Sequence, residues 1–178
     1  MPAVPGHADT PDARSSVEEA VSFLDAMSSA YPASGSPTLP QSYADELGLF
    51  STSFVYDAAL AVCAALAAGR TGLARRVGDG LLFAQDHDST YDDGQLRQAY
   101  NVGPYVFYDG NPSPYGLVRP DGTANIGWQF GFLGTAVGDM AWPSIALVRL
   151  YAATGDARYL EGARKIATGG AWLVGSPR

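Results

Sequence analysis

The sequence contains a single cysteine, Cys63, so no disulfide can form within the chain. It contains two histidines, His7 and His87, which are too few for the usual zinc ligand sets. Lys165 is the only lysine, and the formal net charge of −7 argues against a nucleic-acid partner and a basic membrane-surface helix. These shortages exclude a disulfide scaffold and disfavour zinc, nucleic-acid and membrane binding.

Long hydrophobic runs are missing too, and none approaches the roughly 20 residues of a membrane-spanning helix. The N-terminus lacks the basic and hydrophobic regions of a signal peptide, but a secreted protein with its signal removed would look the same. Cytoplasmic and secreted locations therefore both stay open. Residues 1–14, rich in Pro, Ala, Asp and Gly, predict a flexible leader, and residues 15–178 predict a single domain.

A helix-hairpin pattern occurs twice, at residues 56–77 and 138–166. Each copy has an aspartate at its start, Asp57 or Asp139. Each also has a glycine at the turn between its two helices, Gly69 or Gly155. Because one hairpin cannot bury its own apolar face, the repeat predicts hairpins packed side by side. The glycines lie 86 residues apart and the aspartates 82, so the structural equivalence of the two aspartates stays open.

Apolar periodicity and stop signals predict five helices, at about residues 15–29, 54–68, 71–85, 143–153 and 157–174. Ser16 and Glu19 have the spacing of a capping box at the start of the first helix. Pro143 suits the first turn of the fourth helix. The prolines of residues 31–42 predict a loop.

Between residues 86 and 137 helical periodicity gives way to glycine, proline and aromatics. Turn pairs occur at Asp93-Gly94, Asp109-Gly110 and Asp121-Gly122. Short strands at 105–108 and 116–119 predict a β-hairpin. The fold class is therefore all-α, built of tandem helical hairpins with a small β-hairpin insertion. Five helices leave one without a hairpin partner, which indicates a fragment or a chain completed by a partner such as a second copy.

Four segments, 56–60, 86–94, 137–142 and 152–160, together resemble the six-hairpin (α/α)6 toroid glycosidase superfamily. The resemblance covers roughly residues 50–174 and implies a partial toroid, about half a barrel, with a saccharide substrate. The superfamily includes glycoside hydrolases, polysaccharide lyases and sugar epimerases, so the resemblance implies the ligand more firmly than the reaction. Glycoside hydrolysis is the leading expectation, and the remainder of the barrel would come from elsewhere.

Paired carboxylates would carry this chemistry, since glycoside hydrolysis needs a proton donor and a second carboxylate that acts as base or nucleophile. Asp139 is the strongest candidate for the acid or base, and its alternative role is a helix N-cap. Asp57 is the first candidate for its partner, and a favourable interaction with the helix dipole is its alternative role. The pair Asp92-Asp93 is the other candidate, in an acidic run that also reads as a solvated polar loop.

That acidic run does not fit a calcium loop, because the glycine and the closing glutamate of an EF-hand are missing. No metal site is expected, and no phosphate loop, dinucleotide fingerprint or nucleophile elbow implies a cofactor. Aromatic platforms suit the apolar faces of sugar rings, although several of them must serve the core instead. The expected substrate-binding residues are Tyr56, Tyr91, Trp128, Trp142 and His87. The rival function is a non-catalytic helical-repeat module that binds a glycan or a protein.

Overall fold

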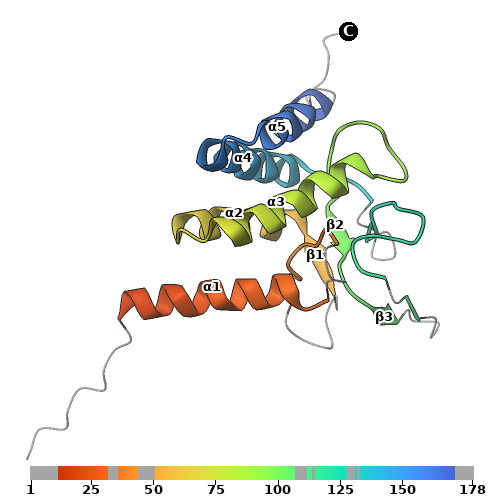
Figure 1. Ribbon diagram of the computed structural model, residues 1–178. Helices are drawn as coiled ribbons and strands as arrows, with labels where there is room; N and C mark the ends of the chain where they lie inside the picture. The colour runs from red at the N-terminus through yellow and green to blue at the C-terminus, as the bar shows by residue number, and fades with distance from the viewer. Residues whose placement is uncertain are drawn as a thin grey trace, which may run out of the picture.

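The computed structural model describes residues 12–31, 36–43, 51–106, 112–113, 115–127, 131 and 133–170. Helices dominate this part of the chain (Figure 1). The helices are α1 Ala13–Ser29, α2 Val55–Ala67, α3 Thr71–Asp86, α4 Val137–Thr154 and α5 Ala157–Gly170. The strands are β1 Thr52–Phe54, β2 Ala99–Asn101, β3 Tyr105–Val106 and β4 Pro112–Ser113. The prediction of a mainly helical fold with a small β insertion is confirmed. Within these residues no helix is both long and apolar enough to cross a bilayer.

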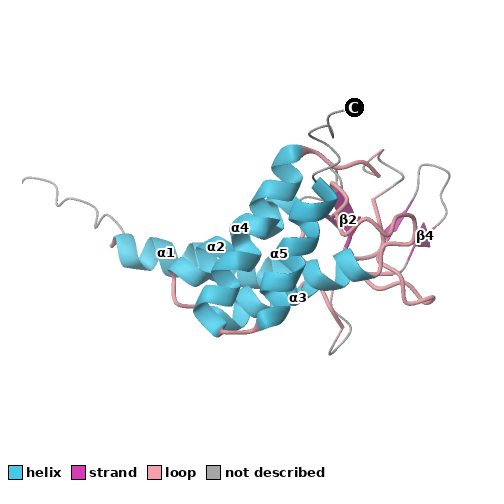
Figure 2. Ribbon diagram, turned by 90° about the horizontal axis from the view of Figure 1, so that it is seen from above, coloured by secondary structure: helices cyan, strands magenta, loops and turns pink. Residues whose placement is uncertain are grey.

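Two helical hairpins, α2–α3 and α4–α5, form the body of the fold. Glycines with positive φ, Gly69 at 71° and Gly155 at 70°, make the turns where the repeat places them. The hairpins pack through α2 against α4 and, less extensively, through α3 against both α4 and α5. Figure 2 shows the helices gathered together, with the strands and loops beside one end of the group.

The direction of each helix follows from the glycine contacts. Gly78 of α3 lies against Leu150 of α4, and farther along α3 Leu82 lies against Gly162, which also approaches Leu147. Thus α3 and α4 are antiparallel, so α2 and α4 run parallel. Both begin at the end of the body where α3 and α5 finish and where the irregular segment lies.

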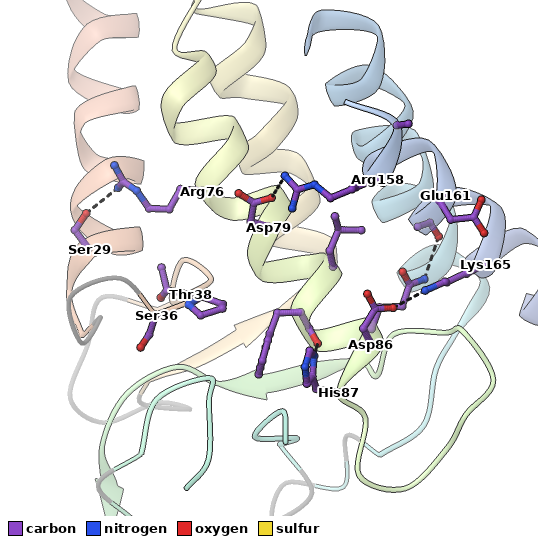
Figure 3. Close-up of a pocket in the computed structure, with 16 residues that line it drawn as sticks. Ser29, Ser36, Thr38, Arg76, Asp79, Asp86, His87, Arg158, Glu161 and Lys165 are labelled. Atoms are coloured by element: carbon purple, nitrogen blue, oxygen red, sulfur yellow. Dashed lines mark hydrogen bonds and ion pairs between the residues drawn. The ribbon is translucent and has the colours of Figure 1, made fainter. Parts of the chain in front are cut away.

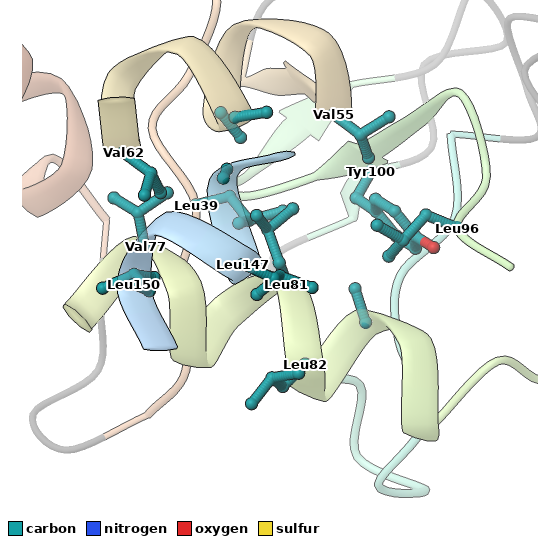
Figure 4. Packing of buried hydrophobic residues seen from close by; sticks show 14 of the residues in the cluster. Leu39, Val55, Val62, Val77, Leu81, Leu82, Leu96, Tyr100, Leu147 and Leu150 are labelled. Atoms are coloured by element: carbon teal, nitrogen blue, oxygen red, sulfur yellow. The ribbon is translucent and has the colours of Figure 1, made fainter. Parts of the chain in front are cut away.

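The core lies between α2, α3 and α4, and residues after α3 close it (Figure 4). The largest apolar side chains under 2% exposed are Leu39, Leu81, Leu96, Leu147, Leu150, Ile166, Val55, Val62, Val77, Tyr100 and Tyr159. Cys63 is half-buried and packs against this cluster, as its position in an apolar helix predicts. Tyr159 is a packing residue too, and its hydroxyl donates to Asp79 at 3.0 Å. Burial, and next the nearby Asp79 charge, raise the pKa of Tyr159 to about 12.

Two helix starts differ from the sequence prediction. Helix α1 begins at Ala13, and the Asp12 side chain accepts a hydrogen bond from the Arg14 N–H at 3.4 Å, so the predicted Ser16 capping box is wrong. Residues 13 and 14 of the predicted leader therefore belong to α1, and residues 1–11 lie outside the described part. Helix α4 begins at Val137, six residues before Pro143, which lies inside the helix.

The strands form two antiparallel pairs, β1 with β2 and β3 with β4, and all of them except β1 lie in the irregular segment. The partner predicted for the 105–108 strand is wrong, because Tyr105–Val106 pair with Pro112–Ser113 and not with 116–119. Val118 instead forms a bridge with Ala124 across the Asp121-Gly122 turn, where Gly122 has a φ of 83°. A local turn closes a shorter loop than the predicted hairpin and therefore sacrifices less chain entropy.

Candidate functional site

Asp57 and Asp139 both lie in the first turn of their helices, the parallel helices α2 and α4. Each is the third residue of its helix, since α2 begins at Val55 and α4 at Val137. A carboxylate in the first turn interacts favourably with the partial positive charge at a helix N-terminus. The shared position places both acids at the same end of two packed neighbours, as the repeat predicts.

Tyr56 and Trp142 join the two helices at this end. Their ring centroids are 5.7 Å apart and the planes meet at 75°, an edge-to-face arrangement. Tyr56 is 39% exposed and Trp142 is half-buried against the core, so part of the pair faces solvent. Two of the five predicted substrate-binding residues therefore come together, from the same two helices that carry the acids.

Asp139 is the unusual carboxylate of the protein. It is 9% exposed, and its Oδ2 atom is buried without a hydrogen-bond partner among the described residues. Burial raises the pKa of the Asp139 carboxyl above its ordinary value of 3.8, and the backbone N–H of Ala136 offsets part of that rise. Burial disfavours the charged form of an acid, so this group keeps its proton to higher pH than a free aspartate.

The N-cap interpretation of Asp139 is wrong in its detail. The N-cap of α4 is Ala136, with extended backbone angles, and Asp139 lies three residues inside the helix. Pro143 lies four residues farther on, and proline has no N–H to donate to the Asp139 carbonyl. Nearby, Ser144 Oγ donates to the Met140 carbonyl at 2.8 Å. The first turn of α4 is therefore an irregular place for a buried acid.

Asp57 is solvent-exposed, in contrast to Asp139. In the described part of the chain it forms no hydrogen bond or ion pair. An exposed carboxylate beside a buried one with a raised pKa gives two acids in different environments. Different environments are the usual basis for dividing acid and base roles between two carboxylates.

The acidic run is organised by an arginine that the sequence reasoning missed. Arg97 is 3% exposed and pairs through Nε with Asp88 Oδ2 at 2.6 Å and through one terminal nitrogen with Asp93 Oδ1 at 2.5 Å. The Asp88 contact is an ion pair without hydrogen-bond geometry. Tyr91 covers the guanidinium at 4.6 Å from its ring centroid. The sequence signal was available, since Arg97 lies four residues after Asp93 and closes the run.

Backbone hydrogen bonds complete this ordered loop. Asp88 Oδ1 accepts from the N–H groups of Thr90 and Tyr91, and Asp93 Oδ1 accepts from that of Gln95. Asp93 and Tyr91 therefore have structural partners. The acidic run is not only a solvated polar loop, because Arg97 and backbone N–H groups hold it in place. Asp92 is exposed and lines a cavity of about 630 Å³ together with Asp93, Tyr91 and Lys165.

His87 lies at the end of α3 and lines a second, larger cavity. The imidazole stacks on Phe83 at 4.1 Å between centroids, and its Nδ1 is 3.0 Å from the Phe83 carbonyl oxygen. Both rings line a groove of about 1050 Å³ between α1, α3 and α5 (Figure 3). His87 is thus separated from the aromatic pair of α2 and α4.

The charges along this groove neutralise one another. Arg76 pairs with Asp25 at 2.7 Å, Arg158 with Asp79 at 3.3 Å, and Lys165 with Asp86 at 2.7 Å. Figure 3 shows the last two pairs and a further contact of Arg76 with Ser29. The groove therefore has no excess of one sign that would favour an ionic ligand.

The remaining expectations concern Trp128 and metals. Trp128 lies outside the described residues. Among those that are described, no group of His, Cys, Asp or Glu side chains could hold a metal ion. No protein-family model, curated protein or solved structure matches this chain.

Proposed function

We propose that the protein is a carbohydrate-active enzyme that hydrolyses a glycosidic bond, with Asp139 as the proton donor. The observation that carries this proposal is a buried carboxyl with a raised pKa and one oxygen without a partner, beside an aromatic pair. A general acid must be protonated near working pH and must reach the leaving oxygen. The pKa of Asp139 is shifted in the required direction, and its Oδ2 atom has no partner among the described residues.

Asp57 is the second carboxylate in this proposal. Both acids lie in the first turns of neighbouring parallel helices, at the same end of the body. Inverting glycosidases hold a water molecule between two carboxyl groups about 6.5–9.5 Å apart, and this is the arrangement we propose for the two acids. The Asp92-Asp93 pair is the weaker alternative, because Asp93 is committed to Arg97.

Tyr56 and Trp142 hold the sugar ring in this scheme. An aromatic face covers the C–H face of a saccharide, while neighbouring carboxylates accept hydrogen bonds from its hydroxyls. The scaffold we propose is a segment of an (α/α) toroid, in which α2 and α4 form the inner layer and α3 and α5 the outer layer. The two parallel inner helices and the resemblance in sequence support this assignment.

The test is a panel of polysaccharides, oligosaccharides and aryl glycosides, with binding and product release both recorded. Asp139→Asn should abolish turnover of any accepted substrate while it retains binding, because the amide cannot donate the acidic proton. Asp25→Asn, on α1 and away from both acids, is the matched control and should retain full activity. Equal loss in both variants, or normal turnover by Asp139→Asn, would contradict the assignment.

A second candidate is a module that binds a glycan without cleaving it. It is favoured by the position of the cavities, since the two described above are lined by other residues than Asp57 and Asp139. Binding that depends on Tyr56 and Trp142, with no product from any glycan, would support this module. Product release that depends on Asp139 would reject it.

A further inference from the structure

A backbone bridge links the starts of α2 and α4. The N–H of Val55, the first residue of α2, donates to the Gln98 carbonyl at 3.1 Å. The Gln98 N–H in turn donates to the Gly134 carbonyl at 2.9 Å, and Gly134 lies three residues before the start of α4. Both helix starts are therefore held by one residue, which fixes the first turns that carry Asp57 and Asp139.

The polar side chains of this region are acidic or uncharged. Asp57 is exposed and forms no ion pair in the described part of the chain, so no cation neutralises its carboxylate. Thr135, the residue before the N-cap of α4, has a buried hydroxyl oxygen without a partner among the described residues. Neither first turn contains a lysine, arginine or histidine. The region therefore offers hydrogen-bond acceptors and negative charge.

Most basic residues of the chain lie far from these two turns. The sequence has eleven lysine and arginine residues, and all of them except Arg178 are described. Arg149 follows Asp139 by ten residues in α4, which is about 15 Å along the helix axis. Five others lie towards the opposite end of the body, where α3 and α5 begin: Arg14, Arg70, Arg75, Arg76 and Arg158.

The four remaining basic residues are paired with acids. Arg97 precedes the bridging Gln98, but it is 3% exposed and bound between Asp88 and Asp93. The other pairs are Arg119 with Asp121, Arg164 with Glu161 and Lys165 with Asp86. No cation of the described chain is thus left to bind an anionic ligand at Asp57.

We propose that the saccharide bound at this site carries no acidic group, which excludes uronates and sulfated or phosphorylated sugars. This inference rests on the proposed function, because it takes Asp57, Tyr56 and Trp142 as saccharide-binding residues. A sugar carboxylate held at Asp57 would meet a like charge, and no described cation would offset the repulsion. An uncharged sugar avoids it, since its hydroxyls donate to Asp57 while its C–H face covers the aromatic pair.

Matched pairs of aryl glycosides test this substrate class. A glucoside and a glucuronide, or a galactoside and a galacturonide, differ only in the hydroxymethyl or carboxylate group at C6. We expect kcat/KM for the uronide to be lower by at least about 10-fold at low salt, and the difference should shrink as salt is added. Where a glycoside is bound without cleavage, the Kd should show the same preference.

The outcomes separate this inference from the proposed hydrolysis. A uronide that is cleaved as efficiently as its uncharged partner would overturn the inference and leave the hydrolysis standing. If none of the polysaccharides, oligosaccharides and glycosides is bound or cleaved, the proposed function fails and the inference fails with it. Binding without cleavage, with the expected preference, would reject hydrolysis and support the inference.

A positive charge added to the first turn of α4 tests the electrostatic cause. Gly138 and Gly72 are each the exposed second residue of a helix, and a Cβ at either has no neighbouring atom within 4 Å. Gly138→Lys should reduce the preference for the uncharged glycoside by at least about 3-fold at low salt. Gly72→Lys is the matched control at the opposite end of the body and should leave the preference unchanged. An unchanged preference in Gly138→Lys would overturn the inference.

Discussion

Replacing Arg97 by methionine tests how the acidic loop is held. The guanidinium is 3% exposed and its ion pair with Asp88 involves a carboxylate side chain that is 2% exposed. Methionine fills a similar volume without charge, so it removes the pair and leaves the Asp88 charge buried. Asp93 also loses its partner, but its side chain is 34% exposed and water can replace that contact.

Breaking a buried ion pair from one side costs about 3–5 kcal/mol, because the remaining charge stays desolvated. The Thr90 and Tyr91 N–H groups still bond Asp88, so we expect the lower part of this range. A loss of about 3 kcal/mol is a large share of the roughly 5–15 kcal/mol that stabilises a domain. Urea unfolding should show a lower midpoint with an unchanged slope.

Arg119→Met is the matched control. Arg119 is 40% exposed and its Nε lies 4.0 Å from Asp121, so the substitution should cost no more than about 1 kcal/mol. If Arg97→Met also cost less than about 1 kcal/mol, water would reach Asp88 and the pair would not be a buried one. The double variant Asp88→Asn with Arg97→Met gives a second test. If the Asp88 charge is buried, removing it should restore part of the stability lost in Arg97→Met, and a double variant no more stable than Arg97→Met would contradict the argument.

Two further predictions concern a glycine and the candidate acid. Gly78→Ala should destabilise the protein by about 1–3 kcal/mol in urea unfolding, since the new Cβ would lie 2.3 Å from Cδ1 of the buried Leu150. Gly138→Ala is the control, because a Cβ at that position has no neighbouring atom within 4 Å. The raised pKa of Asp139 stabilises the fold below the ordinary value of 3.8, and this stability is lost as pH rises through the native value. The difference between the melting temperatures of Asp139→Asn and wild type should therefore shift in favour of the variant as pH rises. A shift in favour of wild type would contradict a buried Asp139 with a raised pKa.

The helices could be predicted because their signals are local. Gly69 and Gly155 mark both hairpin turns, and α2, α3 and α5 begin within one residue of the predicted positions. The start of α4 was wrong because Pro143 resembles a first-turn proline, whereas here it lies inside a longer helix. Proline marks a helix start by preference only, and packing against α2 outweighs that preference.

Strand pairing and the acidic loop required information that is not local. The Pro112–Ser113 strand has no alternation that would identify it, and its pairing with β3 depends on the path of the chain. The spacing of Arg97 four residues after Asp93 is a local signal for their ion pair, but the burial of Arg97 follows from the loop folding around it. By contrast, the contact of Tyr56 with Trp142 follows from the repeat, because equivalent positions of packed repeats lie side by side.

The environment of Asp139 is the observation on which its proposed catalytic role rests. An acid in the first turn of a helix is explained by the helix dipole and by the Ala136 N–H, but these account for one side of the carboxyl. Its Oδ2 remains buried with no partner among the described residues, and an unsatisfied buried polar atom costs about 1–3 kcal/mol. Alanine at a purely structural position would avoid that cost, because it has no polar side-chain atom to bury. In the proposed function, the oxygen of a ligand accepts the proton that the Asp139 carboxyl retains.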